Sequence, residues 1–501
     1  MHGTCQTSSF TWRHPVVHHA AARPSNRLNA EVPMTAVGAP SSTSAPPVRS
    51  TALLTALVLA VAGYQINATM LSPALPNVID SLGTTSGAGG LSQTLFFLFS
   101  AIGQVTLARL SDYVGRRRML LMTLVVALVG ELVCVLAPNI ELFIIGRSLQ
   151  GVSAATFTLA YLTLHESLPP RKFGRSLGII TAVNGGIAGV DTVIGGSVAD
   201  SVGFRGIFLI TGLIAVIALV AVHFWVPATG TAAGRMDWTG AALLGIGLTG
   251  ILLALNEGSS WGWSSVPTLT LLVGGVLALV LFAVAERGKQ NAIIDTSVLA
   301  SRAGWPLLLT TIFTLAGVFG MLNFTIPLLT QTAGEGYGLS ATMSALLYLT
   351  PASALGVIAA PLVGHFGPRI GWRLSVLIGA AGTAAALVPL VLVPRSQVVV
   401  LAALAVLGIT YTGYMLTALT GLAVALAPED KPGSLPGLNG ACFGIGASLG
   451  IAVAASAVTA TSGDGAPTFD AFHAALWTAG GFVALALITA LLIKTPQSEN
   501  N

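Results

Sequence analysis

Three ionisable side chains lie inside long apolar stretches of the sequence. Glu131, Arg147 and Asp191 are each surrounded mainly by apolar residues. An ionised group in a bilayer is costly unless it is paired or faces a water-filled cavity, so such positions are functional candidates. A carboxylic acid can load a proton, and a nearby Arg can tune that acid through its charge. These residue types therefore favour proton coupling.

The positions of these residues allow all three to lie at one depth. Glu131 and Arg147 are each eight residues from Asn139, which lies in a turn between two apolar stretches. At ~1.5 Å per residue, both are about 12 Å from that turn. Asp191 is fourteen residues into its own stretch, or ~21 Å from the opposite side. One interpretation is a Glu131–Arg147 ion pair that only joins the hairpin; the other is that Asp191, Glu131 or both load a proton.

The composition indicates that the bilayer is the main solvent of the chain. Of 501 residues, 54% are hydrophobic and 8% are charged, against about 25% charged in a soluble domain. The net charge is only +4 and the basic residues are scattered, unlike the basic stripe of a nucleic-acid-binding surface. Cys5, Cys134 and Cys442 have neither disulfide-framework nor metal-ligand spacing. A soluble enzyme and a nucleic-acid partner are excluded.

Fourteen apolar stretches are long enough to cross a membrane, which takes roughly 20 helical residues. The seventh and eighth are the weakest, and a twelve-span interpretation would drop or merge them. The predicted spans are 52–76, 90–111, 118–137, 140–164, 177–199, 205–226, 239–256, 267–285, 304–330, 340–365, 373–394, 397–427, 433–460 and 471–493.

Basic residues are distributed unevenly over the connecting segments. With a cytoplasmic amino terminus, 19 of the 22 Lys and Arg residues lie inside, Arg205 and Arg395 lie outside, and Arg147 lies within a span. This asymmetry follows the positive-inside rule. It predicts a multi-pass protein of the cytoplasmic (inner) membrane with both termini in the cytoplasm and an even number of spans.

The amino-terminal residues 1–50 are polar and rich in Pro and Ser. They contain no apolar core before a small-residue cleavage site, so they do not form a secretory signal. Their four histidines could bind a metal, but we interpret them as incidental residues of a disordered cytoplasmic tail, and Met34 is a candidate for the true start. A short carboxy-terminal tail at 495–501 is also expected.

Two matches at nearly one spacing indicate an internal duplication. Segment 108–117 (ARLSDYVGRR) matches 364–373 (GHFGPRIGWR) at an offset of 256, and the Asn-Gly of 184–189 matches that of 439–444 at an offset of 255. A duplicated six-span unit leaves spans seven and eight as an inserted pair. Transporters with two such halves rock them about a central site. The predicted parts are an N-terminal six-helix bundle at 51–226, a linker with two extra helices at 227–303 and a C-terminal six-helix bundle at 304–494.

Several motifs occur in the order and spacing of one family. Asp112, Gly115, Arg116 and Arg117 match a loop signature after the second span, with Ala108 in place of its leading Gly. The fourth-span motif is matched by Arg147, Gln150, Gly151, Ala154 and Ala155. The segment Met236–Gly240, the tryptophans Trp261 and Trp263, and Gln331 fit the same family's fourteen-span branch. Over residues 50–495 the chain thus resembles the major facilitator superfamily, and within it the drug/proton antiporters.

The resemblance implies an all-α membrane protein: two six-helix bundles, two inserted helices and fourteen transmembrane helices in all. It implies an exporter of small amphipathic compounds or drugs, and hence antibiotic resistance, by proton antiport with alternating access. Two departures keep an uptake symporter or uniporter open: Asn67 replaces the branch's first-span acid, and Asp191–Thr192 replaces its fifth-span Gly-Pro. A transporter-like membrane sensor is a further alternative.

The loop signature predicts a conformational latch formed by Asp112, Gly115, Arg116 and Arg117. Gly permits the tight turn, and Asp at a helix end can pair with Arg or with the amides of a neighbouring helix. The alternative is a solvated turn whose basic residues only set topology.

Polar and aromatic side chains within the spans are candidates for lining a substrate cavity, although each also suits simple packing. Tyr and Met would suit a large apolar guest. The candidates are Tyr64, Asn67, Met70, Gln150, Phe157, Tyr161, Asn184, Asn323, Tyr411, Tyr414 and Met415.

The sequence contains no Gly-x-x-x-x-Gly-Lys-Ser/Thr motif, so we expect no ATP hydrolysis by this chain. It also contains no recognisable nucleophile or metal constellation, and we expect no enzyme activity and no cofactor. The expected energy source is a proton gradient, and the expected partners are a small-molecule substrate and the lipid bilayer. The chain is expected to be monomeric.

Overall fold

The computed structural model describes residues 50–169, 172–173, 176, 179–180, 189–228, 231, 236–287, 289, 301–302, 304–427, 434–462 and 466–493. Every regular element in this part of the chain is helical, as predicted. The first group of elements, here called the N-terminal half, is α1 (Ser50–Thr69), η1 (Ser72–Ala74), α2 (Leu75–Leu82), α3 (Ser86–Val114), α4 (Arg116–Leu136), α5 (Ile140–Gly151), η2 (Val152–Ala154), α6 (Ala155–Ser167), α8 (Val190–Ser201) and α9 (Phe204–Trp225).

Two further helices, α10 (Trp238–Trp261) and α11 (Val266–Ala285), precede a second group, the C-terminal half. Its elements are α13 (Gly304–Thr314), η3 (Leu315–Phe319), η4 (Met321–Thr325), α14 (Ile326–Gln331), α15 (Ala341–Ser344), η5 (Ala345–Leu349), α16 (Thr350–Ile370), α17 (Trp372–Leu392), α18 (Gln397–Leu407), η6 (Gly408–Met415), α19 (Leu416–Ala425), α20 (Ser434–Ser462) and α21 (Phe469–Leu491).

Thirteen helical stretches of the described residues are long and apolar enough to cross a membrane. They match every predicted span except the fifth, 177–199. Residues 177, 178 and 181–188 of that span lie outside the described residues, and α8 is the helix that the structure describes at its end. Fourteen spans and two cytoplasmic termini therefore stay predictions.

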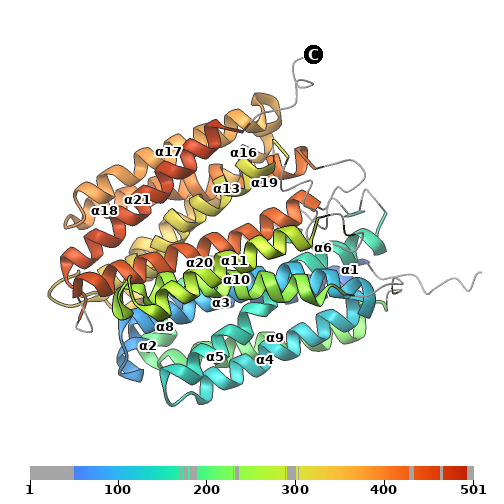
Figure 1. Ribbon diagram of the computed structural model, residues 1–501, viewed down its shortest axis with the longest axis horizontal. Helices are drawn as coiled ribbons and strands as arrows, with labels where there is room; N and C mark the ends of the chain where they lie inside the picture. Colours follow the sequence, from blue (N-terminus) through green and yellow to red (C-terminus); the bar gives the residue numbers. More distant parts are fainter. Residues whose placement is uncertain are drawn as a thin grey trace, which may run out of the picture. The chain divides into compact units, whose positions relative to one another are not determined.

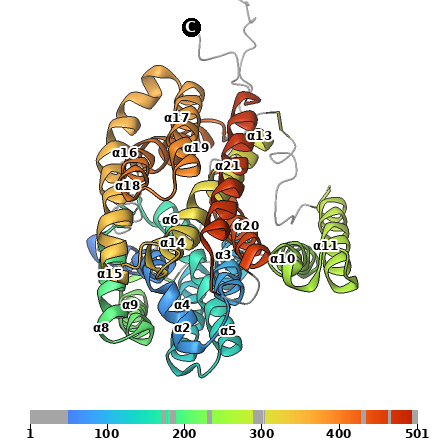
Figure 2. The same cartoon turned by 90° about the vertical axis from the view of Figure 1, so that its left-hand side faces the viewer.

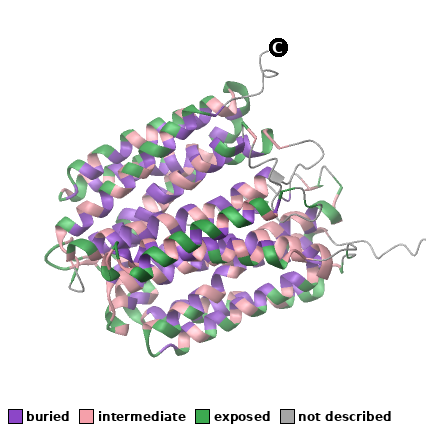
Figure 3. Ribbon diagram, viewed as in Figure 1, coloured by how far each residue is buried: buried purple, intermediate pink, exposed green. Residues whose placement is uncertain are grey.

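The two halves form separate groups of helices that meet along α3 and α20 (Figure 1). The inserted pair α10 and α11 lies to one side, with α10 packed against α3 and α20 (Figure 2). Burial follows this arrangement (Figure 3). In the most apolar window of α20, 72% of residues are buried, compared with 22% for α11. A largely lipid-facing α11 can keep an apolar surface because lipid, not water, is its solvent.

The duplicated loops have the same structure. The helices that follow them, α4 and α17, have 21 residues each and start 256 positions apart. Each is preceded by a Gly in the left-handed region, Gly115 with φ 95° and Gly371 with φ 87°. A side chain would be strained at that φ, which explains why both copies use Gly. The duplicated segment therefore has the same turn and the same length of following helix in both halves.

Candidate functional site

A break in the first span brings two backbone turns into the bilayer region. Helix α1 ends at Thr69, and Pro73 and Pro76 lie in the first turns of η1 and α2. Proline lacks an amide hydrogen and cannot continue a helix interior. Discontinuous helices of this kind commonly form the binding sites of secondary transporters. The break places Asn67, Thr69 and Ser72, all buried, at the level of the predicted acids.

Glu131 accepts hydrogen bonds from three neighbouring helices. Its Oε1 accepts from Asn67 Nδ2 at 2.6 Å, and its Oε2 accepts from Gln150 Nε2 at 3.1 Å and from Thr211 Oγ1 at 2.8 Å. The side chain is only 3% exposed. A buried carboxylate requires such compensation, and Glu131 therefore faces the interior of the half and not the lipid.

Arg147 is fully buried and lies beside this carboxylate. Its guanidinium donates to Asn67 Oδ1 at 2.6 Å, to Gln150 Oε1 at 2.6 Å and to Gln93 Oε1 at 2.7 Å. It also stacks over the ring of Phe96 at 4.0 Å, a cation–π contact that strengthens when water is absent. Three amide oxygens and one aromatic face thus take the place of water around the Arg147 guanidinium.

Two amides, and not a direct ion pair, join Glu131 to Arg147 among the described residues. Asn67 and Gln150 each donate to Glu131 and accept from Arg147. The interpretation of a direct Glu131–Arg147 ion pair is therefore replaced by a hydrogen-bond network that also includes the first span. Because Asn67 is shared by both charges, a change of charge on Glu131 acts directly on α1.

Asp191 lies on another side of the same α1 segment. Thr69 Oγ1 donates to its Oδ2, and the residue is 3% exposed. Among the described residues its Oδ1 has no hydrogen-bond partner. Asn67 and Thr69 are two residues apart, or about 200° around a helix, so α1 separates the two acids and contacts both. Both acids are buried in the described structure.

Two contacts join the first span to the C-terminal half. Ser72 Oγ donates to Asn323 Oδ1. Gln331 Nε2 donates to the Pro73 carbonyl at 2.7 Å. Both involve the broken segment between α1 and α2. The predicted cavity residue Asn323 therefore lies at the boundary between the halves.

The other predicted cavity residues lie in different environments. Tyr64 is partly buried and stacks on Phe96 with the ring centroids 6.0 Å apart. Tyr161 stacks on His165, whereas Phe157 packs on the edge of the N-terminal core. Asn184 lies outside the described residues. Of the rest, Met70, Tyr411 and Met415 are buried in apolar clusters and Tyr414 is partly buried.

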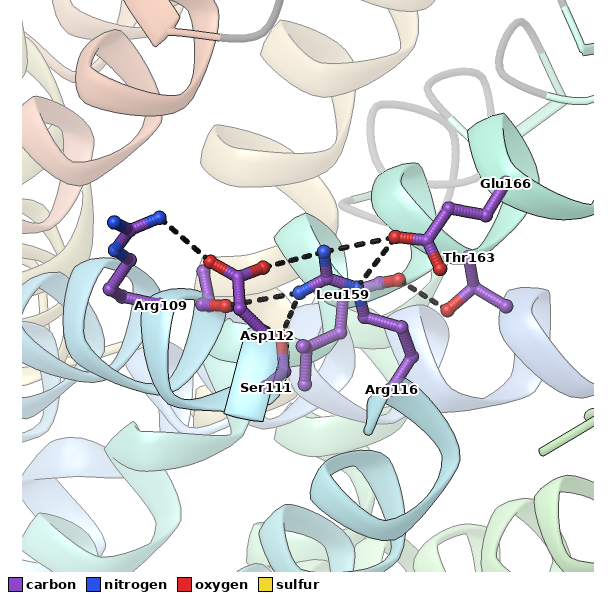
Figure 4. A network of polar contacts seen from close by, with 8 residues as sticks. Arg109, Ser111, Asp112, Arg116, Leu159, Thr163 and Glu166 are labelled. Carbon is purple, nitrogen blue, oxygen red and sulfur yellow. Dashed lines mark hydrogen bonds and ion pairs between the residues drawn. The ribbon is translucent and has the colours of Figure 1, made fainter. Parts of the chain in front are cut away.

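The loop signature forms a charge network within the N-terminal half (Figure 4). Arg116 Nη2 lies 2.6 Å from Asp112 Oδ1 and 2.9 Å from Glu166 Oε1, and Asp112 also pairs with Arg109 at 2.9 Å. The network joins the ends of α3 and α6 to the start of α4. Arg117, a predicted latch residue, instead donates to the carbonyl of His223.

Sequence reasoning missed three side chains of these networks. Gln93 and Thr211 contact the buried charges, and Glu166 completes the Arg116 network. Each comes from a helix other than that of the charge it contacts: Gln93 from α3, Thr211 from α9 and Glu166 from α6. Their identities alone do not show which way they face, so only the packing of the helices reveals them.

Comparisons with known proteins agree with this architecture. The profile of the Major Facilitator Superfamily matches residues 57–236 and 238–451. The chain is 36% identical over 410 residues to a uridine/deoxyuridine transporter of Lactococcus lactis subsp. cremoris (strain MG1363), covering 79% of this chain and 85% of that protein. It is 29% identical over 419 residues to the multidrug resistance protein Stp of Mycobacterium tuberculosis (strain CDC 1551 / Oshkosh), covering 82% and 76%.

Solved structures share the fold at lower identity. A POT family transporter in complex with 5-aminolevulinic acid superposes with a TM-score of 0.65 at 14% identity, covering 88% of this chain and 96% of that one. Such a likeness concerns the fold alone. Taken together with the profile match, which spans both halves and the inserted pair, it shows that the chain belongs to the Major Facilitator Superfamily of membrane transporters.

Proposed function

We propose that the protein is a proton-coupled secondary transporter that takes up a small polar solute of the nucleoside type by alternating access. In this proposal Asp191 carries the proton, and Glu131 and Arg147 couple its charge state to α1. The energy comes from the proton gradient, and no cofactor is required.

The observation that carries proton coupling is the environment of Asp191. Its carboxyl group is buried, hydrogen-bonded through one oxygen and unpartnered at the other among the described residues. A protonated acid can donate from that free oxygen, whereas a buried carboxylate without a partner is costly. Loading and release of a proton would therefore change the contact between α8 and α1.

The chemistry of the central network favours a polar cargo. Amides and hydroxyls surround the two charges of the Glu131–Arg147 cluster, and Tyr64 beside them offers a partly exposed aromatic ring. A nucleoside carries both a planar ring and several hydroxyl groups, which such groups recognise by stacking and hydrogen bonds. The uridine/deoxyuridine transporter among the relatives supports the same cargo class.

A proton-driven exporter of drugs, the antiporter function implied by the motifs, is the second candidate. The match to the fourth-span motif and the similarity to the multidrug resistance protein Stp favour it. Against it stand the two departures from the antiporter branch: Asn67 in place of the first-span acid and Asp191–Thr192 in place of Gly-Pro. Uptake therefore ranks first.

The proposal keeps the predicted architecture. The chain would have fourteen spans, two cytoplasmic termini and a monomeric state in the cytoplasmic membrane. Its parts would be bundles at 51–226 and 304–494, linked through 227–303. The predicted cavity residues, with Tyr64, Asn67, Gln150 and Asn323 foremost, would line the route of the solute.

Purified full-length protein in liposomes tests both candidates. Uridine and a lipophilic cationic dye are offered under a pH gradient of either sign. Symport predicts uridine accumulation when the outside is acidic, and collapse of that accumulation by a protonophore. Antiport predicts dye accumulation when the inside is acidic. Accumulation of neither compound under either gradient would contradict both candidates for these cargo classes.

The variant Asp191→Asn tests the proton site. We expect it to abolish gradient-driven accumulation while uridine exchange between the two sides continues, because the amide keeps a hydrogen-bonding group but cannot carry the proton. Asp80→Asn, an exposed acid at the end of α2, is the matched control. Gradient-driven transport retained in Asp191→Asn would remove this residue from the mechanism.

A further inference from the structure

One seam between the halves runs along α8 and the span Ala341–Ile370. The backbones come so close that a Cβ added at Gly196 would lie 2.6 Å from the Ala341 carbonyl oxygen. Further along the seam, Thr350 Oγ1 donates to the Gly189 carbonyl at 3.0 Å. Figure 2 shows α8 and α15 side by side at this place.

The far end of this seam is closed by a carboxylate. Asp200, in the last turn of α8, accepts the backbone N–H of Ala341 at 3.1 Å and the backbone N–H of Thr342 at 2.8 Å. The hydroxyl of Thr342 donates to the same carboxylate at 2.5 Å. Hydrogen bonds to an ionised acceptor are stronger than neutral ones, and the first amides of a helix have no partner within it. One side chain of the N-terminal half thus satisfies the start of a span in the other half.

We propose that Asp200 is a positioning residue of the gate at this end of the molecule, holding the start of the span Ala341–Ile370 against α8 until the halves part. The contact is specific in geometry, since it uses both carboxylate oxygens. It is also reversible, because the carboxylate is exposed and water can replace each bond.

Neighbouring contacts support a closed gate at this end. The bonds from Ser72 to Asn323 and from Gln331 to Pro73 also cross between the halves, and η1 packs against both α8 and α15. Opening at this end requires all of these contacts to break together. Asp200 is the ionisable member of the set and makes three of its hydrogen bonds.

The ionised form of Asp200 suits this role. Burial works to raise the pKa of Asp200, but the hydrogen bonds from Thr342, from Ser340 and from the Ala341 amide hold it below its usual value. The carboxylate therefore stays charged at neutral pH. The contact between Asp200 and the start of the span Ala341–Ile370, here called the Asp200 latch, therefore responds to movement of α8 and not to ordinary changes of pH.

Helix α8 also carries Asp191, nine residues before Asp200, or about 13.5 Å along the helix. A shift of α8 at Asp191 would therefore reach the latch through a single rigid element. This link rests on the proposed function, whereas the latch itself follows from the contacts of Asp200 alone.

Thiol labelling of the purified full-length protein tests the latch without any substrate. The reporter is Ser72→Cys, because Ser72 is 2% exposed and lies between the halves. The native Cys134 and Cys442 are buried, and the protein without the reporter measures the background from these two and from Cys5. Adding Asp200→Ala to the reporter should raise the maleimide labelling rate by up to about fivefold, the range of an exposed charge contact.

Matched variants separate a latch from a general loss of structure. Asp80→Asn should leave the labelling rate unchanged, and Asp200→Asn should give an intermediate rate because its amide oxygen still accepts one N–H. Thermal unfolding and size-exclusion profiles establish that each variant is folded. A folded Asp200→Ala protein that labels at the reporter's rate would overturn the proposal, as would an equal increase in Asp80→Asn.

A double-mutant comparison tests the link to Asp191. If α8 transmits the loss of charge at Asp191, Asp191→Asn should alter the labelling rate when Asp200 is present. It should have little effect in a protein that also carries Asp200→Ala. Additive effects would overturn the link and leave the latch standing. The labelling assay contains no cargo, so failed uridine transport with a normal labelling pattern would count against the proposed function only.

Discussion

The two halves of the protein share a structural repeat but differ in what they bury. Within the spans of the N-terminal half, the described structure buries Glu131, Arg147 and Asp191. The buried polar residues described in the C-terminal spans are Ser, Thr, Asn and Tyr, apart from a buried Cys442. One repeat therefore carries charges and the other carries neutral groups, and under the proposed function proton loading belongs to the first half.

Corresponding positions of the repeat show which residues make this difference. Positions 256 residues after Glu131 and Arg147 hold Leu387 and Ala403, both in the apolar core of the C-terminal half. By contrast, the positions 256 residues after Asn67 and Thr69 are Asn323 and Thr325. Both copies thus keep polar residues at the same helical level, but only one surrounds them with ionisable partners.

Backbone geometry differs in the opposite direction. The described C-terminal half contains four π-helical segments, η3, η4, η5 and η6, in three of its spans, and the described N-terminal half contains none. A π-helical turn misaligns the regular hydrogen-bond ladder and often marks a functional position. In the described structure the N-terminal half therefore concentrates buried charges, whereas the C-terminal half concentrates irregular helical turns.

The largest expected effect comes from breaking the charged half. Arg147→Ala leaves Glu131 buried without its positive neighbour, which should lower the free energy of unfolding by about 3–5 kcal/mol. Denaturant unfolding of the purified protein in detergent measures this loss.

A second variant turns this loss into a test of the comparison. Glu131→Leu with Arg147→Ala gives the N-terminal half the residue types found at Leu387 and Ala403. The double variant should lose less stability than Arg147→Ala, because no uncompensated charge remains. Equal losses in the two proteins would mean that shape, and not charge, is what the network supplies.

A smaller effect is expected in the neutral half. Thr311 Oγ1 donates to Asn439 Oδ1 at 2.7 Å between α13 and α20. Thr311→Val removes this bond and should lower the free energy of unfolding by about 0.6 kcal/mol. The pH-gradient dependence of uridine accumulation should stay as in the parent. A changed proton dependence would show that coupling extends into the C-terminal half and would erase the contrast.

Periodicity and length predicted thirteen of the spans, because apolar length alone determines whether a helix can cross a bilayer. The cost of buried charge likewise identified Glu131, Arg147 and Asp191 as residues that need partners. The partners themselves could not be predicted. Gln93 is an ordinary polar residue until the rotation of α3 about its axis is known, and Asp200 meets Thr342 across 142 positions.

The loop network at the end of α3 tests whether surface charges add to the contrast. Glu166 is 38% exposed at its side chain and shares Arg116 with Asp112. Glu166→Gln should change the free energy of unfolding by no more than about 0.5 kcal/mol, because water screens the pair. Asp112→Asn should cost more, since Asp112 pairs with both Arg109 and Arg116. A loss of stability in Glu166→Gln as large as that expected for Arg147→Ala would mean that this network stabilises the protein as much as the buried one.

The smallest expected effect concerns Asp200 near neutral pH. Its pKa is lower than usual in the closed gate, so its contribution to closure is fully present above the ordinary Asp pKa, about 4, and is lost only as pH falls through the lowered value. Nearby Arg205 donates to the carbonyls of Val135 and Ala137 and leaves this window unchanged. The labelling rate of the Ser72→Cys, Asp200→Ala protein divided by that of Ser72→Cys should therefore stay constant from pH 8 to pH 5. Taking the ratio cancels the pH dependence of the thiol itself. A ratio that falls across this range would show that a group other than Asp200 titrates there and controls the gate.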